Sequence, residues 1–265
     1  MKGTYQFIFT ETGNRTGTLW LNRPQVRNAF HEGMITEIMQ GIRDLTADPA
    51  VRVILLRGEG KAFCAGADVN WMRNVAGYSW EQNYRESLRL AECFHTLYSC
   101  PKPSIAVVYG ASIGGANGLV AACDMAYACD EAVFSLSEVK LGLVPAVISP
   151  FVIRRTGEYT ARELMLTGRR FTGKEAEHYR LVNRSLPEAE LEEHLEEMIA
   201  LLLAAGPQAL TRCKLLINGV TNQWSLKDAL AETARMIASV RISAEGQEGM
   251  RAFLEKRDPS WINQE

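Results

Sequence analysis

The sequence predicts an α/β fold with mostly parallel strands, followed by a helical region. Three observations support this prediction. Short apolar runs typical of strands alternate with segments whose apolar residues have helical spacing. Two of the strand-like runs lead into turns of small residues, as happens where a helix follows a strand. Beyond residue 187 the pattern is helical almost throughout, so we expect an α/β core over 1–186 and a helical region over 187–265.

The elements of the core are expected to begin with a hairpin. Tyr5–Thr10 and Gly17–Leu21 are β-rich runs on either side of the turn residues 11–15. A helix should follow, because apolar residues between Met34 and Leu45 fall on one helical face. The next expected elements are a strand at 51–57, a helix at 79–98, a strand at 104–109, a helix at 114–123, and strands at 125–129 and 132–136. In the last region, helices are expected near 188–205, 207–217, 225–240 and 244–256.

The composition limits the class of protein. With 265 residues and 47% hydrophobic content, the chain can build one substantial core and a smaller helical layer. Its 29 basic and 31 acidic residues include no long basic run, so no nucleic-acid partner is expected. No run approaches about 18 apolar residues, and the amino terminus has no apolar signal region. We therefore expect a cytoplasmic protein without a membrane partner.

The cysteines and histidines indicate neither a disulfide framework nor a metal site. The six cysteines contain no Cys-x-x-Cys pair, and several lie in apolar runs, so reduced thiols are expected. The four histidines share no spacing typical of metal ligands. We expect no bound metal.

The two small-residue turns, at 63–68 and 112–116, are the first place to look for a functional site. Small residues let a ligand approach the main chain, so both turns can offer free backbone N–H groups to one oxygen atom. Two such donors converging on a thioester carbonyl would make an oxyanion hole. An isolated Gly-Gly turn is more often a simple strand-to-helix connection. The residues around the turns therefore decide between these interpretations.

Five stretches in the same order resemble the crotonase, or enoyl-CoA hydratase/isomerase, superfamily along nearly the whole chain. They are 21–24, 61–68, 110–116, 137–145 and 252–257. The resemblance implies a spiral of ββα units with carboxy-terminal helices used for trimerisation. It also implies an acyl-CoA substrate whose carbonyl is polarised toward an enolate, no cofactor besides the coenzyme A of that substrate, and assembly as a homotrimer or homohexamer.

The resemblance also implies the catalytic groups. The N–H groups of Ala67 and Gly115 would form the oxyanion hole, and Glu138 would move protons. The best-known hydratases of the superfamily carry a second glutamate where this chain has Gly118, and Asn117 is the adjacent polar side chain. We expect water or the acyl branch of the substrate to use the volume beside Gly118. One carboxylate must then serve both proton transfers, another group must help, or the chemistry differs.

Residues that contact coenzyme A are implied in the same way. Arg27, Ala29 and Ala65 would form the adenine slot, and Ala67 and Gly115 would contact the thioester of the substrate. Asp68, Val69 and Asn70 would lie along the pantetheine. Phe253 and Lys256 would approach from the carboxy-terminal helices of this or a neighbouring subunit.

A closer similarity is to bacterial methylglutaconyl-CoA hydratases of leucine breakdown and to related glutaconyl-CoA hydratases of acyclic terpene breakdown. The stretches 114–119, 122–125 and 143–152 carry it. Those substrates have a distal carboxylate, for which the candidate cations are Lys140, Arg154 and Arg155. We expect hydration of a branched 2-enoyl-CoA such as 3-methylglutaconyl-CoA. Two alternatives remain open: a Δ3,Δ2-enoyl-CoA isomerase that uses one glutamate, and a non-catalytic RNA-binding or scaffold relative.

Overall fold

The computed structural model describes residues 5–262 of the chain. These residues form two compact units. The first runs to Leu195 without Pro101–Pro103, and the second consists of Pro101–Pro103 and the chain from Glu196 onward. The division lies beyond residue 187 because the first half of α7 (Glu188–Ala204) belongs to the first unit, where Leu191 and Leu195 are buried.

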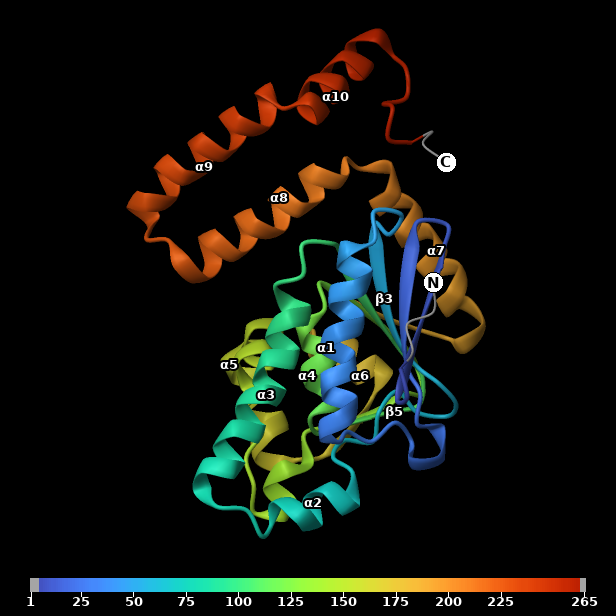
Figure 1. Cartoon of the computed structure of the whole chain (residues 1–265), viewed down its shortest axis with the longest axis vertical. Coiled ribbons are helices and arrows are strands. Elements are labelled where there is room, and N and C mark those ends of the chain that lie inside the picture. The colour runs from blue at the N-terminus through green and yellow to red at the C-terminus, as the bar shows by residue number, and fades with distance from the viewer. Residues whose placement is uncertain (1–4, 263–265) are drawn as a thin grey trace. The chain divides into compact units, whose positions relative to one another are not determined.

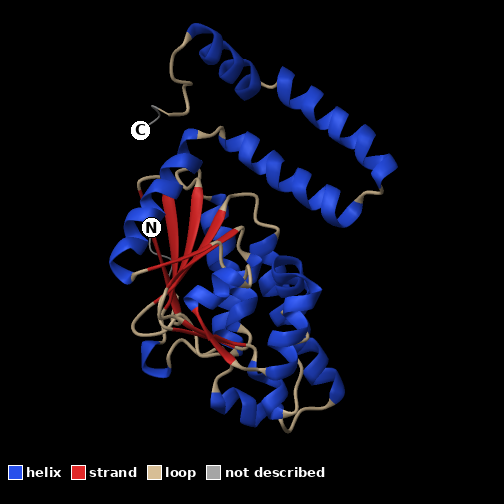
Figure 2. Ribbon diagram, turned by 180° about the vertical axis from the view of Figure 1, so that it is seen from behind, coloured by secondary structure: helices blue, strands red, loops and turns tan. Residues whose placement is uncertain are grey.

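Within the described residues, the strands of the first unit form two sheets (Figure 2). The larger sheet has the strand order β1-β2-β3-β4-β6-β9, and the smaller one has the order β5-β7-β8. In the larger sheet only β1 pairs in the antiparallel direction, which confirms the predicted α/β class. The bounds are β1 Ile8–Gly13, β2 Thr16–Leu21, β3 Val53–Gly58, β4 Ser104–Val108, β5 Ala111–Ile113, β6 Met125–Cys129, β7 Val133–Ser135, β8 Arg170–Thr172 and β9 Arg184–Leu186.

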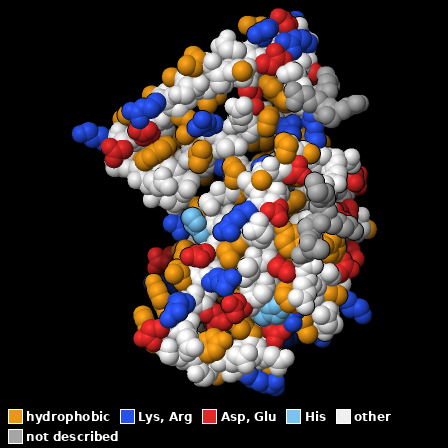
Figure 3. Space-filling view, viewed as in Figure 1, with side chains coloured by type: hydrophobic (Ala, Val, Ile, Leu, Met, Phe, Trp, Pro, Cys, Tyr) orange, Lys and Arg blue, Asp and Glu red, His pale blue; other side chains and the backbone are white. Residues whose placement is uncertain are grey.

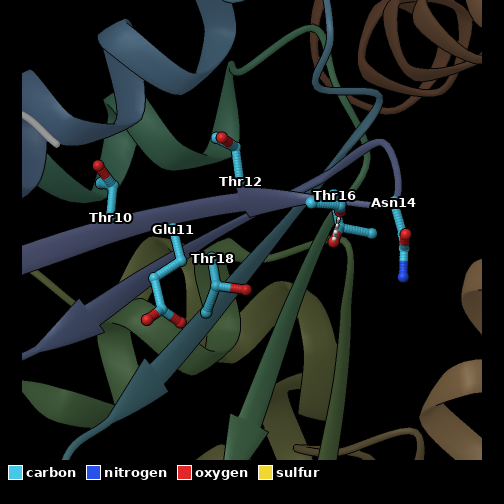
Figure 4. Close-up of a pocket in the computed structure, with 7 residues that line it drawn as sticks. Thr10, Glu11, Thr12, Asn14, Thr16 and Thr18 are labelled. Atoms are coloured by element: carbon cyan, nitrogen blue, oxygen red, sulfur yellow. Dashed lines mark hydrogen bonds between the residues drawn. The ribbon is translucent and has the colours of Figure 1, made fainter. Parts of the chain in front are cut away.

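The amino-terminal hairpin differs from the prediction in the position of its turn. Asn14 and Arg15 both have positive φ, at 47° and 61°, as a two-residue hairpin turn requires. The loop expected over 11–15 is therefore mostly strand. The residues of this hairpin line a polar hollow of about 560 Å³ at the edge of the larger sheet (Figure 4). It is lined by Thr10, Glu11, Thr12, Gly13, Asn14, Thr16 and Thr18, and such polar side chains discourage pairing of the edge with another chain.

The helices of the first unit include three that the sequence pattern predicts, α1, α3 and α4. Their neighbours α2, α5 and α6 have weaker signals; for example, α5 has proline in its first turn and a non-helical glycine inside it. The bounds are α1 Glu32–Ala47, α2 Val69–Val75, α3 Trp80–Tyr98, α4 Ala116–Ala122, α5 Ser149–Thr167 and α6 Gly173–His178, with short helical turns η1 Pro24–Val26 and η2 Ser137–Leu141.

Helices cover both faces of the larger sheet (Figure 1). On one face, a Cβ added to Gly17 of β2 would lie 2.7 Å from the Leu45 side chain of α1. On the other face, Trp20 of β2 contacts Arg57, whose guanidinium bonds the Glu192 carboxylate of α7 at 2.7 Å. Alternate residues of one strand thus point to opposite helices. A parallel sheet buried on both faces follows from this arrangement.

The second unit is helical, close to the ranges that the sequence predicts. Its elements after α7 are α8 Pro207–Asn218, η3 Gly219–Gln223, α9 Leu226–Ile242 and α10 Ala244–Glu255. The Glu245 carboxylate of α10 accepts hydrogen bonds from the N–H groups of Gln208 and Ala209, which satisfies the first turn of α8. In the part of the chain described here, no single helix has both the length and the apolar character to cross a bilayer; α7 and Pro207–Gln223 meet that test only as a pair bent by 100°.

Candidate active site

The two small-residue turns lie against each other in the first unit. Cys64 and Ser112 form an isolated parallel bridge, in which the Ile113 N–H donates to the Cys64 carbonyl at 3.0 Å. Gly66 follows with a φ of 91°, and a Cβ on it would lie 2.9 Å from the Ile113 carbonyl oxygen. A residue without a side chain is therefore required at this contact.

The backbone N–H groups of Ala67 and Gly115 flank this contact. An adjacent N–H group is occupied in each turn: Asp68 donates to the Phe30 carbonyl at 2.8 Å, and Gly114 donates to the Ser135 carbonyl at 2.8 Å. Within residues 5–262, neither the Ala67 N–H nor the Gly115 N–H has a backbone acceptor. Ala67 is exposed and Gly115 is half-buried. Two unoccupied donors on neighbouring turns can bind one oxygen atom that gains negative charge.

Glu138 lies beside the second turn, on η2, just after β7. Its Oε1 is 3.2 Å from the point that a Cβ on Gly114 would occupy. Its Oε2 is buried and has no hydrogen-bond partner in the described part of the chain. Burial raises the pKa of the Glu138 carboxyl above its ordinary value. A carboxyl group with a raised pKa can both accept and return a proton near neutral pH.

The place of a second carboxylate, at Gly118, is filled by apolar side chains. A Cβ on Gly118 would lie 2.6 Å from Cγ2 of Ile148 and 2.7 Å from Cζ of Phe94. Both of these side chains are buried, and the Phe94 ring packs edge-on against Phe151. The expectation that water or an acyl branch uses the volume beside Gly118 is therefore wrong. The glycine lets α4 pack closely against α3 and the segment before α5.

Arg155 is a structural residue, which corrects its interpretation as a substrate-binding cation. Its guanidinium donates to the carbonyls of Val120 and Cys123, both at 2.9 Å. It also donates to Oδ1 of Asn183 at 2.7 Å. These carbonyls belong to the last turn of α4, which has no further helical N–H to bind them. The guanidinium thus closes the end of that helix.

The other two candidate cations lie on the surface. Arg154 donates to the Pro150 carbonyl at 2.8 Å within α5. Lys140 is exposed on η2, two residues after Glu138. Leu141, Leu143 and Val144, which follow it, are more than half exposed. The segment after Glu138 therefore presents one ammonium group among apolar side chains.

Most of the residues implied in coenzyme A binding surround the first turn. The Ala65 N–H donates to the Arg27 carbonyl at 2.9 Å, which joins the two segments predicted to form the adenine slot. Ala29, two residues after Arg27, is buried. Val69 and Asn70 are exposed at the start of α2.

Asp68 has a structural partner for its carboxylate. The guanidinium of Arg23 lies 2.9 Å from it, and the Asn70 N–H donates to it at 2.8 Å as the cap of α2. Burial alone would raise the pKa of Asp68, but the hydrogen bonds from Arg23, Asn70 and Trp71 outweigh burial and lower it. Its carboxylate therefore holds the first turn in place.

Phe253 and Lys256 lie at the end of α10, in the second unit. The Phe253 side chain is 83% exposed, and Lys256 is exposed in a left-handed conformation at the helix end. The contact of these two residues with coenzyme A stays a prediction.

Sequence reasoning did not single out Phe30 near the second turn, and it noted Asn117 only as the polar neighbour of Gly118. Phe30 is buried, and its ring lies 3.6 Å from the point of a Cβ on Gly115. Asn117 is fully buried in the first turn of α4. The one signal for Asn117 is its polar side chain in an otherwise apolar helix, because a buried amide needs hydrogen-bond partners.

A cluster of charged or metal-binding side chains would indicate a second site. On the face in Figure 3, basic and acidic side chains are interspersed. Among the residues that the structure describes, no group of three or more His, Cys, Asp or Glu side chains is arranged to hold a metal ion.

Comparison with known proteins places this chain and its fold in one family. The model of the enoyl-CoA hydratase/isomerase family matches residues 11–264. The mitochondrial enoyl-CoA hydratase of Pongo abelii is 30% identical, over 98% of this chain and 89% of that protein. An enoyl-CoA hydratase structure from Shewanella pealeana has a TM-score of 0.94 at 38% identity, and covers 97% of each chain. The structure of Pseudomonas aeruginosa AtuE has a TM-score of 0.93 at 35% identity, and covers 97% of this chain and 100% of AtuE.

Two amide donors without a backbone acceptor thus lie beside one half-buried carboxylate on this α/β fold. The chain belongs to the enoyl-CoA hydratase/isomerase family and is an enzyme of the enoyl-CoA hydratase type, a hydro-lyase.

Proposed function

We propose that this enzyme adds water to a branched 2-enoyl-CoA with a distal carboxylate, such as 3-methylglutaconyl-CoA. The observation that carries the proposal is the position of the Glu138 carboxylate beside Gly114, next to the unoccupied N–H of Gly115. The thioester carbonyl would accept hydrogen bonds from Gly115 and Ala67. Both bonds strengthen as the oxygen becomes an enolate oxygen, which lowers the barrier.

Glu138 would supply both proton transfers. Its carboxylate takes a proton from water while the water oxygen bonds to C3 and the double-bond electrons move toward the thioester oxygen. The protonated carboxyl then returns that proton to C2 as the enolate collapses, and the product contains one added water. Burial of the carboxyl supports this double role, because it brings the acid and base forms closer in energy near neutral pH.

The segment after Glu138 supports the choice of acyl group. Lys140 offers a cation for a distal carboxylate. The exposed side chains of Leu141, Leu143 and Val144 offer apolar contacts for a methyl-branched chain. Leucine or acyclic terpene breakdown would supply such a substrate.

A second function, Δ3,Δ2-enoyl-CoA isomerisation, is favoured by the apolar filling around Gly118. Without a second carboxylate, Glu138 can move a proton between two carbons of the acyl chain and needs no water. The product would then have the same mass as the substrate.

We propose that the enzyme assembles into a homotrimer or homohexamer through its second unit. We also propose that it works in the cytoplasm. Large apolar side chains stay exposed on the helices of the second unit, among them Leu226, Leu230, Ile242 and Leu254. A groove of about 480 Å³ between α8 and α9 is lined by Leu216, Met236, Ile237 and Val240, among others. Exposed apolar patches of this kind are typical of subunit interfaces.

The acyl preference can be tested with Lys140→Ala and a matched control, Arg154→Ala. We expect Lys140→Ala to lower kcat/KM for 3-methylglutaconyl-CoA by about 10–100-fold, because a charged hydrogen bond contributes roughly 1.5–3 kcal/mol. The kcat/KM for crotonyl-CoA, which has no distal carboxylate, should stay close to that of the wild type. Arg154→Ala should change neither value. An equal loss on both thioesters would remove the support for a carboxylate-bearing substrate.

A further inference from the structure

Asn117 has a hydrogen-bond partner for each polar group of its side chain, although it is fully buried. Its Nδ2 donates to the carbonyl oxygens of Gly114 at 3.1 Å and Ser135 at 2.9 Å. Its Oδ1 accepts a hydrogen bond from Oγ of Ser112 at 3.1 Å. Carbonyl oxygens can only accept, so the amide nitrogen must face them.

The Gly114 carbonyl belongs to the same peptide group as the Gly115 N–H. Because a trans peptide group is planar, its C=O and N–H point in opposite directions. The Gly114 carbonyl oxygen accepts two hydrogen bonds from Asn117, one from Nδ2 at 3.1 Å and one from the backbone N–H at 3.0 Å. Fixing the carbonyl on one side therefore fixes the direction of the Gly115 N–H on the other.

The same side chain connects this turn to β7. The Ser135 carbonyl oxygen accepts from the Gly114 N–H at 2.8 Å and from Asn117 Nδ2 at 2.9 Å. Glu138 follows Ser135 by three residues. One buried amide thus holds the turn with the backbone donor against the strand that leads to the carboxylate.

We propose that Asn117 is a positioning residue, which orients the Gly114–Gly115 peptide so that the Gly115 N–H points at the thioester oxygen. The proposal rests on the proposed function, since it requires Gly115 to be an oxyanion donor. When the amide is lost, the Gly114 carbonyl keeps only the hydrogen bond from the backbone N–H of residue 117. The Gly114–Gly115 peptide can then rotate. Rotation withdraws the donor from the enolate oxygen and leaves the coenzyme A contacts unchanged.

The test compares Asn117→Ala with Ser112→Ala. The alanine variant at 117 should fold, because the Gly114 carbonyl keeps its backbone donor and the Ser135 carbonyl keeps the Gly114 N–H. We expect kcat to fall about 10–100-fold, a part of the roughly 10²–10³-fold loss for a missing oxyanion donor. The dissociation constant of free coenzyme A, which has no acyl carbonyl, should not change. Ser112→Ala removes a bond in the same cluster that does not touch the peptide, so its kcat should stay near that of the wild type.

Difference infrared spectroscopy of bound butyryl-CoA gives a readout that a merely structural role would not move. The thioester carbonyl frequency should be lowered on wild type and on Ser112→Ala, and lowered less on Asn117→Ala. The carbonyl frequency on Asn117→Ser should lie between those on the wild type and on Asn117→Ala, because the serine hydroxyl can donate to the carbonyl three residues back. If the alanine variant fails to fold, the serine variant provides the same comparison.

An unchanged carbonyl frequency in folded Asn117→Ala or Asn117→Ser would overturn the positioning role, whatever the loss of activity. Failure of the proposed function has a different signature. In that case Gly115→Pro, which lacks the donor, would show the wild-type frequency.

Discussion

Oε1 of Glu138 lies 3.2 Å from the point that a Cβ on Gly114 would occupy. Gly114, in the middle of the second turn, therefore leaves room for the carboxylate at this position. Its φ of 55° is a second reason for glycine, because other residues adopt this conformation at a cost.

Gly114→Ala should lower kcat by at least about tenfold, because displacement of a catalytic group by a fraction of an ångström weakens its alignment. Steady-state kinetics with an enoyl-CoA would measure this loss. Gly142→Ala is the matched control, since Gly142 has a φ of 73° and nothing within 4 Å of its Cβ position. Both variants should lose roughly 1–2 kcal/mol of stability from the left-handed backbone. Equal kinetics in the two variants would refute the contact with Glu138.

Glu138→Gln should lower turnover at least about 10²-fold, as expected for loss of a general acid–base group, while binding of acyl-CoA stays largely intact. Calorimetric titration with a saturated acyl-CoA would separate binding from turnover. Near-wild-type turnover in the purified variant would refute the single-glutamate mechanism.

The same variant should be more stable than the wild type at pH 7. Burial raises the folded-state pKa of Glu138, so its contribution to stability is fully present below the unfolded pKa and is lost as the pH rises through the folded pKa. Glutamine does not ionise and avoids this loss. The Tm of Glu138→Gln should exceed that of the wild type at pH 7, and the difference should shrink toward about pH 4, near the ordinary glutamate pKa. A Tm difference that grows at low pH would contradict the assignment.

Gly115→Ala and Gly115→Pro differ in the one feature that matters at the oxyanion hole. A Cβ on Gly115 would be 3.6 Å from the Phe30 ring, in ordinary contact, and the φ of −53° suits both substitutions. Alanine keeps the N–H and should keep most of the activity. Proline removes it and should abolish turnover while the protein still binds free coenzyme A. Activity assays with circular dichroism as a folding control would decide, and an active, folded proline variant would show that the donor is misplaced.

Gly118→Ala should destabilise the fold by about 1–3 kcal/mol, as overpacking of a core does. Without a clash, alanine in a helix would instead stabilise by roughly 0.5–1 kcal/mol. Urea unfolding of Gly118→Ala, Ile148→Ala and the double variant would measure the coupling of the two sites. Additive effects would mean that Ile148 does not fill this position. Gly118→Glu is expected to fail by the same clash, on branched and unbranched substrates alike.

Much of the fold was predictable because local rules decide it. The helix from Glu32 has a clear helical period of apolar residues, and the strand from Val53 begins with a continuous apolar run. The position of the hairpin turn was missed because positive φ at Asn14 and Arg15 is settled by strand twist, which composition alone does not show.

The parts of the site that consist of short sequence motifs, the two small-residue turns and the glutamate, could be predicted. Contacts between residues far apart in the sequence could not. The meeting of Phe94 and Ile148 at Gly118 depends on how three helical segments pack. The role of Arg155 at the end of α4 likewise depends on tertiary structure, because a basic residue on a helix looks the same whether it binds substrate or carbonyls.

The most direct test of the central claim is the mass of the product that the wild-type enzyme forms from 3-methylglutaconyl-CoA. Glu138→Gln serves as the matched control in the same assay. We predict a product heavier than the substrate by one water molecule, formed by the wild type and nearly absent with the variant. A product of unchanged mass with a moved double bond, or equal hydration by both proteins, would contradict a hydratase that depends on Glu138.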